Sequence, residues 1–224
     1  MGNTPHSLAS YIPRMYELLD GYFGNLHWWP ADTPFEVIVG AILTQNTAWR
    51  NVVSTLSKLK EAGLLTPEGL DGADTDTLAS LIRSSGYFRV KSRRLKAFVE
   101  FLRKDHGGRL DNLFDGEIGE IRKKLLQING VGEETADSIL LYAGGKPVFV
   151  IDAYTRRILA RHGIIDVKAK YAEIQKLFMD NLPLSAPLYN QYHALLVNAG
   201  KIFCAKDRRC GDCPLQELTP RTFS

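Results

Sequence analysis

The stretch LLQINGVGEETADSIL, residues 125–140, decides the fold. Apolar residues recur at helical spacing on both sides of Gly130-Val131-Gly132, which predicts one helix ending near Ile128 and another beginning near Glu133. Two glycines let the backbone approach a ligand closely, and free N–H groups at a helix start attract an anion such as a phosphate. From this stretch alone, a glycine-linked helix pair without a ligand is an equally good interpretation. The acids Glu133 and Glu134 directly after the turn are unexpected beside an anion.

Helical periodicity continues along the rest of the chain. Thr33-Pro34-Phe35-Glu36 is a capping box with proline at the first helical position, so a helix is expected to begin at Pro34. Only PVFVI, residues 147–151, resembles a strand, and one strand makes no sheet. We therefore predict an all-α fold. Further helices are expected in WRNVVSTLSKLKEAG, DTLASLIRSSG, VKSRRLKAFVEFLRK, EIGEIRKKLLQI, ETADSILLYAG, AYTRRILARHG, KYAEIQKLFMDNL and LYNQYHALLVNAGKIF.

Composition is that of an ordinary globular protein. The 28 Lys and Arg exceed the 25 Asp and Glu too little to identify a nucleic-acid partner unless the charge is clustered. The sequence lacks both an apolar run of the roughly 18 residues that a membrane span needs and the features of a signal peptide. We therefore expect no membrane partner and a reducing, cytoplasmic location, nucleoid-associated if the source is prokaryotic.

The order of the glycine turn, a short apolar run and VIDAYTRRILARHG resembles the helix-hairpin-helix DNA glycosylases of the endonuclease III superfamily. The similarity extends to GAILTQNTAWRNV, SSGYFRVKSRRLK and HALLVNAGKIFC, and covers most of the chain from Thr33 to Cys213. It implies a six-helix domain, residues 27–136, that ends in the hairpin. Residues 1–26 would join residues 137–224 in a second helical domain with a C-terminal cysteine loop. A monomer would bind double-stranded DNA carrying a damaged base in the cleft between them.

The resemblance makes Asp152, in VIDAYTRRI, the essential aspartate. A fixed carboxylate can stabilise the positive charge that the sugar gains when a glycosidic bond breaks, and it can orient the attacking water. An Asp immediately before AYTRRIL is also a good helix N-cap, and that structural role is the commoner one for the residue type. The two roles are compatible. Its position 18 residues after Glu134 favours catalysis.

Glu134 occupies the position at which bifunctional members of this family carry a lysine. That lysine attacks the sugar to form a Schiff base, which a glutamate cannot do. The resemblance therefore implies a monofunctional glycosylase that needs no cofactor for catalysis and leaves an abasic site. Both acids also suit a first helical turn through the helix dipole, and we assign only this structural role to Glu133. Lys146 is a conceivable substitute nucleophile, without support from the sequence.

Aromatic residues flank the Pro34 helix: HWWP places Trp28, Trp29 and Pro30 before it, and Trp49 follows it. Loop tryptophans are more often packed in a core than in contact with a ligand. However, WWP and TQNT followed by a small residue and an aromatic resemble the 3-methyladenine glycosylase branch, in which such residues form the base pocket. Indoles suit a flipped, positively charged alkylpurine, which is already a good leaving group.

Other residues are candidates for DNA contacts. By the resemblance, Gln45 fills the gap left by the flipped base, although a polar residue at a helix end also caps its own backbone. A basic run around GYF and the arginines at 156, 157 and 161 would flank the duplex, although such runs are usually solvated helix faces. The expected DNA-binding residues are Gln45, Asn129, Gly130, Val131, Gly132, Thr135, Arg89 and Lys91.

Three cysteines, Cys204, Cys210 and Cys213, are too few for the four-thiolate [4Fe-4S] cluster that this family often carries. The family spacing is C-x6-C-x2-C-x5-C; here the first gap is one residue short and Thr219 takes the fourth position. A loop with reduced thiols is favoured, and a different fourth ligand or zinc stays open. Lys201, Lys206, Arg208 and Arg209 could contact phosphate in either case.

Three alternatives stay open. A uracil or thymine mismatch glycosylase can also lack the lysine, and a bifunctional endonuclease III-type glycosylase/lyase would need another amine. An adenine glycosylase is disfavoured, because Gly40 stands where that branch carries a catalytic glutamate. The alternative from a different class is a non-catalytic helix-hairpin-helix DNA-binding module, against which Asp152 argues.

Overall fold

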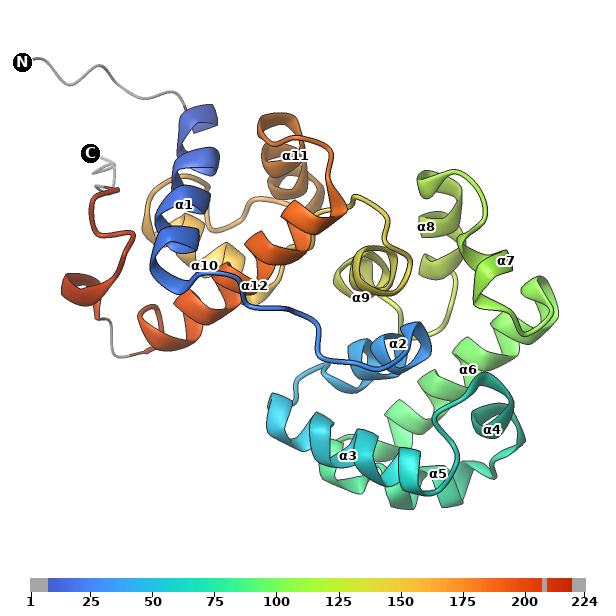
Figure 1. Cartoon of the computed structure of the whole chain (residues 1–224). Helices are drawn as coiled ribbons and strands as arrows, with labels where there is room; N and C mark the ends of the chain where they lie inside the picture. Colours follow the sequence, from blue (N-terminus) through green and yellow to red (C-terminus); the bar gives the residue numbers. More distant parts are fainter. Residues whose placement is uncertain (1–7, 207–208, 219–224) are drawn as a thin grey trace, which may run out of the picture. The chain divides into compact units, whose positions relative to one another are not determined.

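The computed structural model describes residues 8–206 and 209–218. The described residues form helices and loops without a strand, which confirms the predicted all-α class (Figure 1). The apolar run at residues 147–151 is extended, and Val148, Phe149, Val150 and Ile151 are buried. None of the described helices is long and apolar enough to cross a membrane.

The chain divides into two compact units. Residues 29–146 form one, which we call the hairpin unit, and residues 1–28 with 147–224 form the other, which we call the terminal unit. The sequence predicted a boundary at residue 136, ten residues too early. The helix that starts after the glycine turn continues through Ile139, Leu140 and Leu141, which are at most 3% exposed, and this segment packs against the Pro34 helix. Its apolar side chains therefore belong to the core of the hairpin unit.

The hairpin unit begins with α2 (Pro34–Leu43), whose N-cap Thr33 accepts a hydrogen bond from the Glu36 N–H, as predicted. Glu36 in turn accepts from the N–H of Asp32 rather than from Thr33. Eight of the ten residues of α2 are buried, which makes it the central helix of this unit. The other elements are α3 (Trp49–Glu61), α4 (Pro67–Gly72), α5 (Thr75–Leu81), η1 (Arg83–Ser85), α6 (Phe88–His106), α7 (Leu110–Phe114), α8 (Ile118–Leu126), α9 (Glu133–Ser138) and the π-helical turn η2 (Ile139–Ala143).

The terminal unit combines the first helix of the chain with its last ones. It contains α1 (Leu8–Phe23), α10 (Ala153–Arg161), α11 (Tyr171–Asn181), α12 (Ala186–Ile202) and the short turn η3 (Cys210–Asp212). Its core is aromatic: the Phe149 ring stacks on Phe178 at 4.0 Å and meets Tyr192 edge-on at 5.6 Å. The Tyr192 hydroxyl donates to the Ile12 carbonyl, which fixes α12 against α1.

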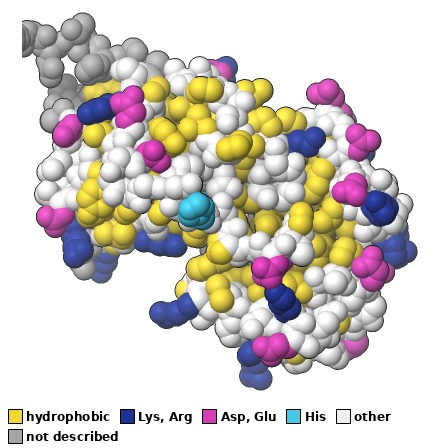
Figure 2. Space-filling view, viewed as in Figure 1, with side chains coloured by type: hydrophobic (Ala, Val, Ile, Leu, Met, Phe, Trp, Pro, Cys, Tyr) yellow, Lys and Arg dark blue, Asp and Glu magenta, His cyan; other side chains and the backbone are white. Residues whose placement is uncertain are grey.

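Surface charge is mixed in sign. Figure 2 shows acidic and basic side chains interspersed on the visible face rather than gathered in one basic stripe. This agrees with a net charge of only +3. The face in Figure 2 therefore carries no continuous basic stripe that would attract DNA through an overall positive field.

Candidate functional site

The glycine turn has the geometry that the sequence predicted. Helix α8 ends at Leu126, α9 begins at Glu133, and Gly130 between them has a φ of 85°, which favours glycine. A Cβ at Gly130 would overlap the Arg94 side chain, so a larger residue here would also require Arg94 to move. Asn129 and Gly132 are exposed and Val131 is buried. The turn thus exposes its backbone to solvent, while the buried Val131 side chain packs into the unit.

Two of the predicted DNA contacts are turned inward. Thr135 is 7% exposed, and its hydroxyl accepts a hydrogen bond of 2.9 Å from Gln45 Nε2. The same Gln45 nitrogen donates to the Gly130 carbonyl at 3.0 Å, and Arg94 donates to Gln45 Oε1. Gln45 is therefore held against the hairpin, and it would have to give up these bonds to fill a gap in a duplex. The side chain of Thr135 serves the hairpin itself.

Lys91 is a correction. The sequence placed it in a phosphate-binding run, but its side chain is buried, with only 1% of the residue exposed. Its ammonium donates to the carbonyls of Leu43 and Ser85, both at 2.7 Å, and to the Thr47 hydroxyl. Desolvation, aided by the Arg94 charge, lowers the pKa of Lys91 to about 8. It cannot reach a phosphate from this position, because it ties the loop after α2 to the loop before α6.

Tyr87 is a surface residue that sequence reasoning missed. It follows Gly86, has a positive φ of 46° and is 73% exposed, two residues before the exposed Arg89. A non-glycine residue held at positive φ with its ring in solvent is uncommon and marks a functional candidate. The sequence feature that could have identified Tyr87 is Gly86 immediately before two aromatic residues in a basic segment.

The expected base pocket is brought together only in part. In the hairpin unit, the Trp29 ring meets Trp49 edge-on at 5.0 Å and lies 5.1 Å from Tyr142. Tyr142 belongs to η2, and π-helical turns of this kind are frequent at functional sites. Trp28 belongs to the terminal unit, where the Lys201 ammonium lies 5.7 Å from its ring centroid, and Pro30 is exposed. Tyr142 was not predicted.

Gly40 explains how Trp29 fits against α2. A Cβ at this position would lie 3.2 Å from the Trp29 indole, so the indole occupies the space next to the helix. By the resemblance described above, an adenine glycosylase would carry its catalytic glutamate at this position. A longer side chain at residue 40 would displace Trp29 from its contacts with Trp49 and Tyr142.

In the terminal unit, Asp152 is the N-cap of α10. It is 8% exposed, and its Oδ1 accepts a hydrogen bond of 2.7 Å from the Thr155 N–H. Its Oδ2 lies 3.8 Å from Nε2 of His193, a buried residue of α12. Desolvation lowers the pKa of His193, the Asp152 carboxylate raises it and Lys201 lowers it, with a net result below the ordinary value. The carboxylate is thus rigidly held and nearly dry.

The arginines that follow Asp152 serve the fold. Arg156 donates to the Ala169 carbonyl at 2.7 Å, and Arg157 donates to the carbonyls of Gly200 and Cys204. Arg161 donates to the Cys204 carbonyl at 2.7 Å and to its Sγ at 3.1 Å. Arg157 and Arg161 thus hold the end of α12, and Arg156 holds the loop before α11, so the expectation that this cluster flanks the duplex does not fit its geometry.

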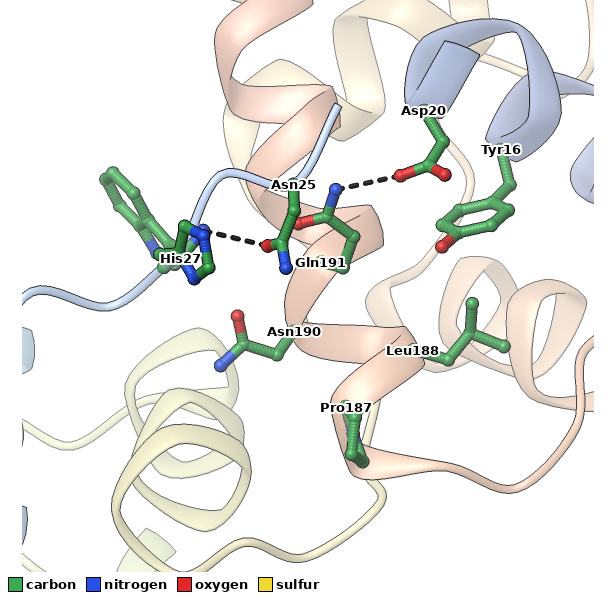
Figure 3. Close-up of a pocket in the computed structure, with 9 residues that line it drawn as sticks. Tyr16, Asp20, Asn25, His27, Pro187, Leu188, Asn190 and Gln191 are labelled. Carbon is green, nitrogen blue, oxygen red and sulfur yellow. Dashed lines mark hydrogen bonds between the residues drawn. The ribbon is translucent and has the colours of Figure 1, made fainter. Parts of the chain in front are cut away.

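A hollow of about 590 Å³ opens in the terminal unit between α1 and the start of α12 (Figure 3). Gln191 lies along it and binds Asp20 Oδ1 and the Gly24 carbonyl, both at 2.8 Å. The loop after α1 contributes Asn25 and His27, and Trp28 also lines the wall. The predicted Trp28 thus borders an open, amide-rich surface.

The cysteines do not fit a four-thiolate cluster, since the chain contains only three. Cys204 Sγ accepts from Arg161, Cys210 is exposed, and Cys213 is buried, which raises the pKa of its thiol. Within residues 8–206 and 209–218, no group of three side chains could hold a metal ion. The fourth expected position, Thr219, lies outside the described residues, as does Arg208.

Glu133 and Glu134 are both exposed in the first turn of α9. Glu133 lies 3.6 Å from Arg122, which also forms a two-bond pair with the buried Asp137 at 2.7 and 3.1 Å. The acids beside the turn therefore suit the helix dipole, and Glu133 adds to an ion-pair network. Glu134 is the residue that the sequence resemblance matched to the lysine of bifunctional relatives, and its carboxylate is exposed.

Comparison with known proteins agrees with this geometry. Residues 39–184 match the family described as HhH-GPD superfamily base excision DNA repair protein. A Methanocaldococcus jannaschii protein, provisionally named a DNA repair glycosylase, is 45% identical over 92% of this chain and 94% of its own. Endonuclease III of Sulfolobus acidocaldarius is 29% identical over 82% and 80% of the two chains. The solved structure of H. pylori 3-methyladenine DNA glycosylase (MagIII) bound to 1,N6-ethenoadenine superimposes with a TM-score of 0.75, at 27% identity over 88% and 98%.

The family match covers most of the chain and the first relative nearly all of it, which confirms the resemblance seen in the sequence. The match begins inside α2, at residue 39, and includes the glycine turn, Glu134 and Asp152. The chain belongs to the HhH-GPD superfamily of base excision DNA repair proteins, as a helix-hairpin-helix DNA glycosylase of the endonuclease III type.

Proposed function

We propose that this chain is a monofunctional DNA glycosylase that removes alkylated purines such as 3-methyladenine from double-stranded DNA and leaves an abasic site. The observation that carries the proposal is the combination of a buried, fixed carboxylate at Asp152 with a glutamate, Glu134, at the position of the lyase amine. A carboxylate supports hydrolysis, whereas Schiff-base chemistry needs an amine.

The chemistry needs few groups. As the glycosidic bond breaks, its electron pair leaves with the base and the sugar becomes positively charged. The negative charge of Asp152 stabilises that sugar, and a water molecule attacks it and releases a proton to the solvent. A 3-methylated adenine already carries a positive charge and leaves as a neutral base, so it needs little acid catalysis. No cofactor takes part in this sequence of steps.

Alkylated purines are favoured by the aromatic residues around α2. Trp29, Trp49 and Tyr142 offer electron-rich rings to a flipped cationic base. The likeness to a 3-methyladenine glycosylase solved with 1,N6-ethenoadenine supports the same substrate class. The Trp28 face is already close to the Lys201 ammonium, so we assign base stacking to the Trp29 cluster rather than to Trp28.

Duplexes that each carry one defined lesion test the proposal. We expect release of 3-methyladenine or 1,N6-ethenoadenine, with strand cleavage appearing only after alkali treatment and no covalent complex trapped by borohydride. Release of thymine or uracil from mismatches instead would assign the chain to the mismatch branch. Cleavage without alkali together with borohydride trapping would support the bifunctional alternative, for which the relationship to endonuclease III is the specific argument.

Absence of base release from every lesion, with DNA binding retained, would support the non-catalytic module.

A covalent complex trapped by borohydride would also require a search for the amine that forms it. Lys201 on α12 is the first to test, because its charge acts on His193 beside Asp152. Lys201→Ala should abolish trapping if that amine forms the covalent complex. Size-exclusion chromatography of the protein with the duplex tests the expected monomer.

A further inference from the structure

His193 is a buried titratable group that the proposed hydrolysis does not use. It lies on α12, is 6% exposed, and its Nε2 is 3.8 Å from Asp152 Oδ2. The other carboxylate oxygen accepts the Thr155 N–H at the start of α10. The backbone therefore fixes one oxygen of Asp152, and the imidazole faces the oxygen that remains.

Few charges act on His193. From α10 the charged neighbour is Asp152, while Arg157 binds the carbonyls of Gly200 and Cys204. On α12 itself, the charge of Lys201, eight residues further along the helix, acts on it. From α1, the Tyr16 ring packs on Tyr192 and Asp20 accepts from Gln191, so neither is directed to the imidazole. Burial, the Asp152 carboxylate and the Lys201 ammonium thus act on the charge state of His193.

Burial and Lys201 outweigh the carboxylate, so the pKa of His193 lies below its ordinary value and the ring is neutral at neutral pH. In that state Asp152 keeps its full negative charge for the sugar. Adding a proton from solvent would place a positive charge 3.8 Å from the carboxylate, inside a poorly hydrated region where opposite charges attract strongly. The resulting ion pair would compete with the developing positive charge on the sugar.

We propose that His193 is a positioning residue that acts as a proton switch on Asp152: the neutral imidazole leaves the carboxylate available, and the imidazolium engages it and stops base release. This proposal rests on the proposed function of Asp152. It predicts that base release slows at acidic pH because His193 becomes protonated, and not because the leaving base changes its charge.

The coupling between the two residues can be measured without an activity assay. The imidazole signals of the intact protein are titrated by NMR, and His193 is identified as the signal lost in His193→Gln. Replacing Asp152 by Asn removes the charge that raises the pKa of His193, so the titration should move down by about one unit or more. An unchanged midpoint would overturn the proposal, whatever the activity.

The second test is the pH profile of 3-methyladenine release, a substrate whose base is charged throughout the range. In the wild type, release should fall by up to about tenfold for each pH unit below the midpoint of His193. In His193→Gln, the fall should disappear or move to lower pH. His106→Gln is the matched control, since His106 is another buried histidine, 7% exposed, in the hairpin unit.

The two proposals fail in different ways. Loss of release in Asp152→Asn with an acid limit that is identical in wild type and His193→Gln would leave the glycosylase intact and overturn the switch. Wild-type protein that releases no base would overturn the proposed function, and the NMR titration would then decide the coupling by itself. A profile shifted equally by His106→Gln would also overturn the switch.

Discussion

The burial of Lys91 is a property that the sequence alone does not reveal. Its neighbours Arg89, Arg93 and Arg94 made it look like part of a phosphate-binding run, yet only 1% of the residue is exposed. Nothing in the local pattern separates a solvated lysine from one whose acceptors come from residues 40 or more positions earlier. Those acceptors, Leu43 and Thr47, are created by the tertiary fold.

The lowered pKa of Lys91 gives a pH-dependent prediction. Between about pH 8 and its ordinary value near 10.4, the unfolded chain holds this proton more tightly than the folded one, so stability from this group rises with pH. From about pH 7.5 to 9.5, the unfolding free energy of the wild type should gain about 2 kcal/mol relative to Lys91→Met. Urea unfolding at both values measures it, and a constant difference would contradict the burial of the ammonium.

The sequence predicted roles for Gln45 and Asp152, and the structure adds the surroundings of both residues. The sequence cannot say that Gln45 is hydrogen-bonded to Gly130 and Thr135, 85 and 90 residues away. For Asp152 it offered capping and catalysis as alternatives, and the structure shows the cap while burying the carboxylate beside His193. Contacts between residues so far apart in the chain depend on which helices pack together. Local sequence patterns do not encode this packing.

At the scale of elements, α10 and α12 meet closely enough to set the position of Asp152. A Cβ at Gly200 would lie 2.6 Å from the Tyr154 ring, two residues after Asp152. Arg157 and Arg161 then bind the end of α12 from the same helix. The start of α10 therefore depends on a glycine that no local pattern marks as special.

Gly200→Ala should push Tyr154 and the start of α10 away from α12. We expect base release to fall by about 100-fold, since a displacement of about 1 Å of a catalytic group has that order of effect, while the protein stays folded. Single-turnover rates and circular dichroism measure the two. Gly119→Ala in α8 is the control, because a Cβ there meets nothing within 4 Å. Equal activity of both variants would argue against this account of the helix contact.

The pair of helices around the glycine turn is joined by Arg122 and Asp137. Asp137 is 0% exposed, so removing its partner leaves an uncompensated buried charge. Arg122→Met should therefore lower the unfolding free energy by about 3–5 kcal/mol, measured by urea unfolding. Lys104→Met, which breaks the exposed pair with Glu100, should change little. A small effect of both would show that the pair does not hold the hairpin.

For the whole molecule, the sequence was sufficient for the helical class, most helix positions and the family. The capping box at Thr33 and the turn at Gly130 are local signals, and they were read correctly. The unit boundary was placed ten residues early, because whether η2 joins the hairpin unit depends on packing against α2. Trp28 and Trp29 are adjacent in sequence but belong to different units, which no composition argument could reveal.

The net charge of +3 is small, so individual phosphate contacts matter for DNA binding, and Arg89 is an exposed basic candidate. Arg89→Ala should reduce the slope of log binding constant against log salt by about 0.9, the value for one lost phosphate contact. Arg157→Ala should lower thermal stability and leave the slope unchanged, because Arg157 binds carbonyls within the terminal unit. Fluorescence anisotropy over a salt series measures the slopes, and the reverse pattern would contradict the assignment.

Asp152 carries the central claim, and its capping role can be separated from its catalytic role. Asp74 caps α5 in the same way, with its carboxylate accepting from the Thr77 N–H at 2.9 Å, but it is exposed. Asp74→Asn therefore reports what loss of a carboxylate cap does to the protein. Both variants should keep the helical circular dichroism of the wild type.

The decisive measurement is the single-turnover rate of 3-methyladenine release from duplex DNA by wild type, Asp152→Asn and Asp74→Asn. We predict that Asp152→Asn is slower than wild type by about 100-fold or more, with duplex binding retained, and that Asp74→Asn matches wild type. Release by Asp152→Asn at the wild-type rate would contradict the account, because the buried carboxylate would then be only a helix cap.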